Sequence, residues 1–147
     1  MRTGSYIIAN GFLALIGACA TTPIVEPAES AAFREMVMDY QLFIVPLCDG
    51  ETARAYEAQN ARRDADFVES LRRTPLEADY REAVAAFADL ERGRIRHCSG
   101  PPTPPGVTPP TEEEKAAEKA RSTAAHFRLG DEKFADLVKL RNIILSD

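Results

Sequence analysis

Apolar residues recur every three or four positions between about residues 28 and 45, a spacing that places them on one face of an α-helix. This predicted stripe comprises Phe33, Met36, Val37, Tyr40, Phe43, Ile44 and Leu47. Pro46 should end or kink the helix, because proline has no N–H to donate inside a helix. No alternating pattern typical of a β-strand extends beyond a few residues, so the chain is predicted to be all-α.

Two further helices are predicted, one from about residue 51 to 73 and one from about residue 76 to 97. The apolar stripe of the first is thin, and Asn60 and Asp64 interrupt it. Residues 74–77 read Thr-Pro-Leu-Glu, the order of a capping box with proline in the first turn. Because almost no loop separates two helices of similar length, they should fold back as an antiparallel hairpin.

The last third of the chain begins with a proline-rich segment, residues 99–110, which predicts an extended polyproline II linker. Thr111 and the three glutamates after it repeat the capping pattern and should begin another helix. Leu129-Gly130-Asp131 is typical of a helix end followed at once by a new N-cap. Residues 111–147 are therefore predicted to form a C-terminal helical pair.

The N-terminus has the features of an export signal. A positive start, Met1-Arg2, precedes a mostly apolar run that is too short to span a bilayer and ends in Ile16-Gly17-Ala18-Cys19. This ending resembles the lipobox of bacterial lipoprotein precursors. The resemblance implies cleavage before Cys19, lipid on that cysteine, and, with Ala20 after it, residence at the periplasmic face of the outer membrane.

Ordinary signal peptidase offers an alternative for the same segment. Ala18-Cys19-Ala20 also fits the small-x-small pattern of that enzyme, which would release a soluble periplasmic protein beginning at Thr21. The position of Cys19 directly after the hydrophobic core favours the lipoprotein interpretation.

Cys48 and Cys98 remain as an even pair once Cys19 carries lipid, and in an oxidising compartment a disulfide between them is expected. They flank the predicted hairpin, so the bridge would close its open end. Two free thiols, or metal binding together with His97, is the alternative. No metal site is predicted, because neither cysteine has a second ligand at the close spacing usual for zinc.

Composition and motifs argue against several functions. The 147 residues carry a net charge of -5, which gives no reason to expect nucleic-acid binding. The chain has no nucleophile elbow, phosphate-binding glycine loop, di-iron E-x-x-H pair or haem-attachment motif, so neither enzymatic activity nor a cofactor is predicted. The predicted organisation is a signal peptide (1–18), a lipidated tether (19–27), a helical domain (28–98), a linker (99–110) and the helical pair (111–147).

Arg92, Arg94 and Arg96 form a basic cluster at the predicted end of the third helix. The helix dipole favours cations there, which explains the cluster without a ligand. Contact with an anion, such as a lipid headgroup or a peptidoglycan carboxylate, is the alternative.

Two functional hypotheses follow. The first is a non-enzymatic envelope protein that binds another envelope protein through its helical faces. The second is a carrier or sensor of an apolar ligand held between the helices. The cavity of such a carrier would be lined by Met36, Tyr40, Phe67 and Phe87.

Overall fold

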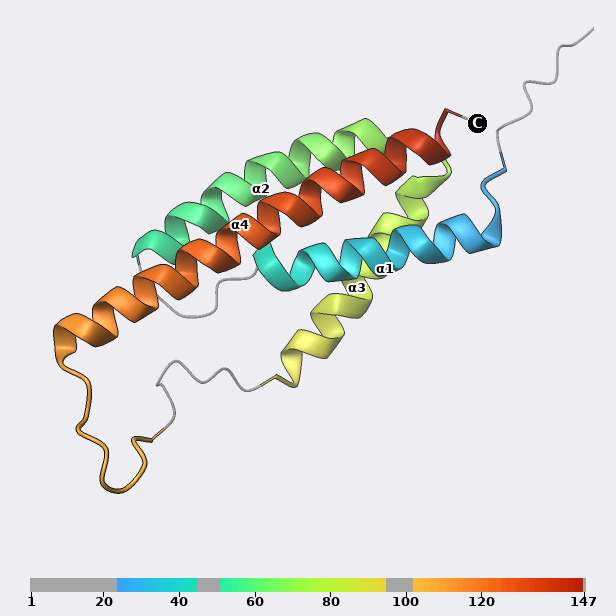
Figure 1. Cartoon of the computed structure of the whole chain (residues 1–147). Helices are drawn as coiled ribbons and strands as arrows, with labels where there is room; N and C mark the ends of the chain where they lie inside the picture. Colours follow the sequence, from blue (N-terminus) through green and yellow to red (C-terminus); the bar gives the residue numbers. More distant parts are fainter. Residues whose placement is uncertain (1–23, 45–50, 95–101, 147) are drawn as a thin grey trace, which may run out of the picture.

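The computed structural model describes residues 24–44, 51–94 and 102–146, and within these ranges it contains four helices and no strand (Figure 1). The helices are α1 (Pro27–Ile44), α2 (Glu51–Leu71), α3 (Leu76–Arg92) and α4 (Glu112–Ile144). The prediction of an all-α protein is confirmed. The first two helices begin and end within two residues of their predicted bounds, whereas α3 ends at Arg92, before Gly93, and not near residue 97.

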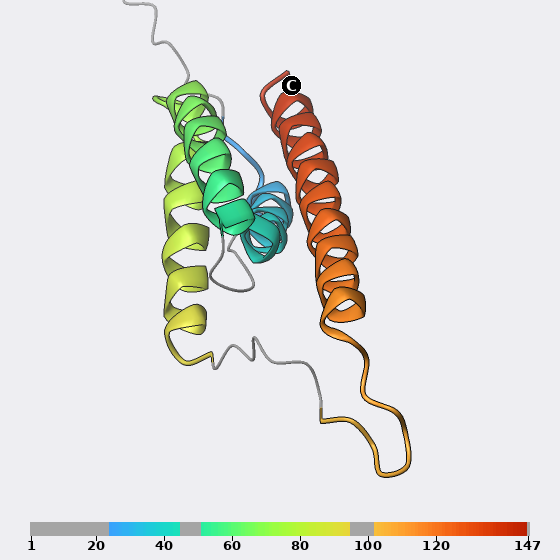
Figure 2. The same ribbon diagram turned by 90° about the vertical axis from the view of Figure 1, so that its left-hand side faces the viewer.

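The central helix of the bundle is α1, which packs against α3 on one side and against α4 on the other (Figure 2). α2 and α4 run in the same direction, and α1 runs opposite to both (Figure 1). α3 turns back from the end of α2 after residues 72–75, but it packs mainly on α1 and much less on α2. The C-terminal half of α4 is thus part of the same bundle as the first three helices.

The core is built from the apolar face of α1 and one stripe from each other helix. Its fully buried side chains are Tyr40, Phe33, Leu71, Leu76, Leu137 and Val37. Aromatic contacts join the helices at its centre: the Phe134 ring lies 5.3 Å from the ring of Tyr40 and 5.5 Å from that of Phe67. The apolar stripe predicted for α1 therefore faces the core over its described part, whereas Pro46 and Leu47 lie outside the described residues.

The predicted C-terminal helical pair is wrong, because α4 is one continuous helix of 33 residues. The helix end predicted at Gly130 is absent, because this residue is buried in the interior of α4. A Cβ placed there would collide with the Tyr56 hydroxyl and lie 3.2 Å from the Cβ of Phe43. Glycine allows α1, α2 and α4 to approach each other here, which is a packing role and not a stop signal.

The proline-rich segment contains a turn, so the prediction of a straight polyproline II linker is wrong over residues 104–107. The Val107 N–H donates to the Pro104 carbonyl at 3.2 Å, and Gly106 has φ 84°. Proline second and glycine third is the order that a type II β-turn requires, since only glycine adopts positive φ without strain. Residues 102–111 are all exposed and form a loop outside the bundle (Figure 2).

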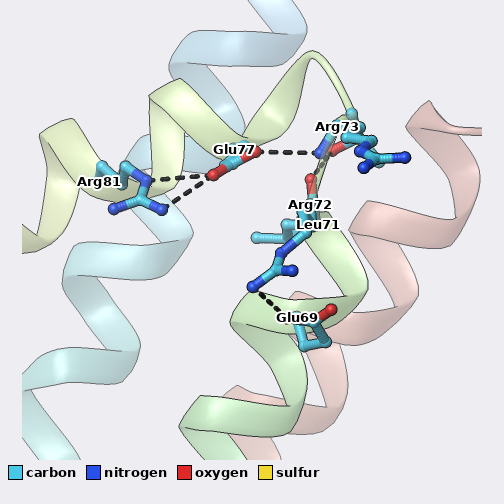
Figure 3. Close-up of polar contacts among 7 residues, drawn as sticks. Glu69, Leu71, Arg72, Arg73, Glu77 and Arg81 are labelled. Carbon is cyan, nitrogen blue, oxygen red and sulfur yellow. Dashed lines mark hydrogen bonds and ion pairs between the residues drawn. The ribbon is translucent and has the colours of Figure 1, made fainter.

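The turn between α2 and α3 is held by Glu77 (Figure 3). Its carboxylate accepts the Arg73 backbone N–H at 3.0 Å and the Arg81 guanidinium at 2.9 Å, and these bonds lower the pKa of Glu77. The predicted capping box is wrong, because the Thr74 hydroxyl donates backwards to the Leu71 carbonyl at 2.6 Å. The Glu77 carboxylate therefore accepts the backbone N–H of Arg73 and not that of Thr74.

Arg73 is the one described residue other than glycine with positive φ, at 64°. An L-residue in this left-handed conformation costs roughly 1–2 kcal/mol, and glycine avoids that cost but loses about 0.4–1 kcal/mol more entropy on folding. Arg73→Gly is therefore expected to raise the free energy of unfolding by about 0.5–1 kcal/mol in urea titrations. Arg72→Gly is the matched control and should lower the free energy of unfolding. Arg72 does not have positive φ, so glycine relieves no backbone strain there. An equal loss of stability in both variants would contradict the proposed backbone strain at Arg73.

Candidate functional site

A polar cluster lies where α2 meets α4, at the positions that interrupt the apolar stripe of α2. Asn60 is only 2% exposed. Arg63 donates to Asn60 and, at 2.6 Å, to Asp131 on α4. Its guanidinium also lies 4.5 Å from the centre of the Phe134 ring, within the range of a cation–π interaction. Arg63 thus links the two helices through one ion pair and one aromatic contact.

Burial and neighbouring groups shift the pKa of three side chains in and beside this cluster. Burial raises the pKa of Tyr40 to about 12, although the nearby Arg63 charge opposes the shift. Burial and a hydrogen bond donated to Asp64 also raise the pKa of Tyr80. For Arg63, burial acts against the charged form, but the interactions with Asp131 and Tyr40 together outweigh burial and raise the pKa. Both tyrosines stay protonated and Arg63 stays charged near neutral pH, so these three groups are poorly suited to acid–base catalysis.

An open groove of about 640 Å³ lies beside this cluster. Its lining comes from α2, except for one ring of α4, and consists of Ala55, Ala58, Gln59, Arg62, Arg63, Asp66 and Phe134. The groove is not the cavity expected for an apolar carrier, since none of the four residues predicted to line that cavity lines it. Tyr40 and Phe67 instead pack against Phe134 in the core.

The N-terminal part of α4, residues 112–122, extends beyond the rest of the bundle (Figure 1). We call this segment the arm. Every residue of the arm is exposed, and the first buried position of α4 is Gly130. At 1.5 Å per residue the arm is about 16 Å long. It is a helical surface without a covering element in the described part of the chain.

Local interactions stabilise the arm without tertiary packing. The capping box predicted at Thr111 is confirmed: the Thr111 hydroxyl accepts the Glu114 N–H, and the Glu114 carboxylate accepts the Thr111 N–H at 2.7 Å. These bonds lower the pKa of Glu114. Lys115 pairs with Glu112, and a second such pair follows six residues later between Arg121 and Glu118. A capped, alanine-rich helix with such pairs is favoured over an uncapped one.

The residues predicted to form sites are only partly described. Cys19, Cys48, Cys98 and Arg96 lie outside the described residues, so the lipidation site and the disulfide stay predictions. The remaining arginines of the basic cluster are described, and each has an acidic partner three residues before it. Arg92 pairs with Asp89, and Arg94 pairs with Glu91 at 2.9 Å.

The described ranges contain no group of three metal-ligating side chains and no helix long and apolar enough to cross a membrane. Comparison with protein families, with curated proteins and with solved structures finds no match to the chain. The proposed function therefore rests on the geometry of the bundle and on its sequence. The most exposed helical segment of the described bundle is the arm. Its helix is predicted from the cap at Thr111, whereas its continuation through Gly130 into the bundle is not.

Proposed function

We propose that the protein is a lipid-anchored, non-enzymatic interaction module of the bacterial envelope, and that the arm is its contact element. One observation carries the second part: α4 continues as a capped, fully exposed helix well beyond the helices it packs against. A helix that is ordered before binding pays less conformational entropy on association. The neighbouring loop, residues 102–111, projects next to the arm and adds an exposed apolar side chain at Val107.

Attachment to the membrane rests on the sequence around Cys19, with Cys48 and Cys98 forming a disulfide in the same oxidising compartment. The mass of the purified protein tests this part. We expect the mass of a chain that begins at Cys19 and carries diacylglycerol, lowered by the mass of two hydrogen atoms because oxidation of Cys48 and Cys98 to a disulfide removes them. A protein that starts at Thr21 would overturn the lipoprotein proposal and support the soluble periplasmic alternative.

Contact through the arm is tested by a photoreactive amino acid placed at Ala116 in the full-length protein in living cells. The matched control carries the same group at Ala86, an exposed alanine of α3 that is also in a helix. We expect a discrete cross-linked product at position 116, little at position 86, and loss of the product when Cys19→Ala removes the anchor. Equal products at both positions, or none at position 116, would contradict the arm as contact element.

A further inference from the structure

Three segments that are distant in the sequence meet at one end of the bundle (Figure 1; Figure 2). They are residues 24–26 before α1, the turn between α2 and α3, and the C-terminal end of α4. The Arg141 guanidinium of α4 donates to the Ser70 hydroxyl of α2 at 2.5 Å, and Val25 packs against the core beside α1. We call this surface the tether end, because the segment that leads from Cys19 reaches the bundle there.

The tether end exposes large apolar side chains to solvent. Ile24 is 94% exposed, Ile143 in the last turn of α4 is 54% exposed, and Leu145 directly after α4 is 38% exposed. Ile144, which lies between the last two in the sequence, is buried in the core. Single exposed apolar residues are normal on a protein surface, but three at one end form a surface that favours an apolar neighbour.

The charges of the tether end do not select a partner of one sign. Arg72 pairs with Glu69 at 2.9 Å, and Glu26 is exposed in the segment before α1. Arg73 is also exposed, and its side chain points away from Glu77 (Figure 3). Because both signs are present, a contact with this surface depends mainly on its apolar side chains. Zwitterionic lipid headgroups carry both signs as well.

The position of Cys19 determines which surface lies nearest to the tether end. Four residues separate Cys19 from Ile24, so even a fully extended chain places their Cα atoms at most about 18 Å apart. Acyl chains on Cys19 hold that residue at the bilayer surface. The 33 residues of α4 span about 50 Å, so the tether end stays close to the lipid while the arm is free to lie far from it.

We propose that the tether end rests on the lipid bilayer itself, with Ile24, Ile143 and Leu145 inserted among the headgroups. Ile143 and Leu145 point to different sides of α4, but they differ by only about 3 Å along its axis, so both reach a surface that meets the helix end-on. The arm then projects away from the membrane. This inference rests on the proposed lipid anchor and adds the orientation of the bundle to it.

The apolar contact orients the bundle and is not needed for attachment. The acyl chains keep the tether end at a high effective concentration next to the bilayer, so a weak contact is enough to favour one orientation. Removing the apolar side chains should therefore free the orientation and leave the protein bound to the membrane. This difference separates a failure of the contact from a failure of the anchor.

A single introduced tryptophan tests the contact, because the chain has no tryptophan of its own. One variant carries Ile143→Trp. The matched control carries Val107→Trp, a position of similar exposure at 56% in the loop beside the arm. Each full-length acylated protein is reconstituted into vesicles of phosphatidylethanolamine and phosphatidylglycerol, with and without bromine on the acyl chains. Brominated chains quench tryptophan emission on close contact.

We expect the tryptophan at position 143 to emit at shorter wavelength and to lose most of its emission in brominated vesicles, whereas the tryptophan at position 107 keeps its emission. Adding Ile24→Ser and Leu145→Ser to the first variant should restore most of the emission while the protein still floats with the vesicles.

Three other results would overturn the inference in different ways. Equal emission at both positions, in a protein that floats with the vesicles, would exclude the lipid contact and leave the anchor standing. Emission at position 143 that shifts to shorter wavelength without quenching by brominated lipid would show that protein, such as a second copy of the chain, covers the tether end. A protein that does not float with the vesicles would overturn the anchor, and the contact with it.

Discussion

Replacing Leu137 by alanine is expected to lower the free energy of unfolding by about 2–5 kcal/mol. Leu137 is fully buried and belongs to the part of α4 that packs in the core. Removing its branched end leaves a cavity among side chains of the other helices, which relax only in part. Urea unfolding monitored by circular dichroism measures the change in free energy. The dependence of this free energy on urea concentration should stay the same if the native state is otherwise unaltered.

The matched control is Ala117→Gly in the arm of the same helix. Glycine there costs about 1 kcal/mol of helix propensity, but Ala117 is exposed and is not part of the core. We expect less helicity in the arm. The urea midpoint of tertiary unfolding, monitored by a near-ultraviolet or NMR signal of the core, should change little. If Leu137→Ala had no more effect than Ala117→Gly, α4 would not be docked on the bundle in the way described.

Sequence periodicity predicted the fold class and the packed face of α1 because both depend on local spacing. A helix with large apolar residues every three or four positions has only one face to bury, and Phe33, Val37 and Tyr40 are indeed fully buried. The cap at Thr111 was predictable for the same reason, since its donors and acceptors lie within three residues of each other.

Features that depend on distant residues were not predictable in this way. Asn60 and Asp64 interrupt the stripe of α2, yet both accept hydrogen bonds: Asn60 from Arg63 on the same helix and Asp64 from Tyr80 on α3. The bond of Asp64 to Tyr80 and the bond of Arg63 to Asp131 on α4 depend on other helices, so local spacing could not predict them. A polar residue inside an apolar stripe is a usable signal for such buried pairing, because burial without a partner is costly.

The role of Gly130 also depends on residues that are distant in the sequence. Glycine in a helical pattern followed by aspartate is typical of a helix end, and local rules alone favour that interpretation. The structure shows that the missing side chain makes room for Tyr56 and Phe43 from two other helices. Because local spacing cannot show that approach, the continuity of α4 through Gly130 could not be predicted, although the beginning of this helix at Thr111 could.

Replacing Gly130 by leucine is expected to lower the free energy of unfolding by about 1–3 kcal/mol, because the new side chain has no space between α4 and its neighbours. Ala135→Leu is the matched control. It adds the same side chain to an exposed position of α4, where a change within about 0.5 kcal/mol is expected. Urea titrations of both variants measure the difference. Equal tolerance at the two positions would show that no close helix approach occurs at Gly130.

A smaller change identifies the side chain responsible. Alanine is a better helix former than glycine by about 1 kcal/mol, so Gly130→Ala would stabilise α4 if nothing lay beside it. The Tyr56 hydroxyl occupies the position that the new Cβ needs, and Tyr56 itself is held by a hydrogen bond to the Phe127 carbonyl and by stacking on the Phe127 ring. Gly130→Ala should therefore destabilise the wild-type protein and cost less in a Tyr56→Phe background, where the hydroxyl is absent. A coupling between the two substitutions of about 0.5 kcal/mol or more would assign the glycine to this contact, whereas simple additivity would assign it to Phe43.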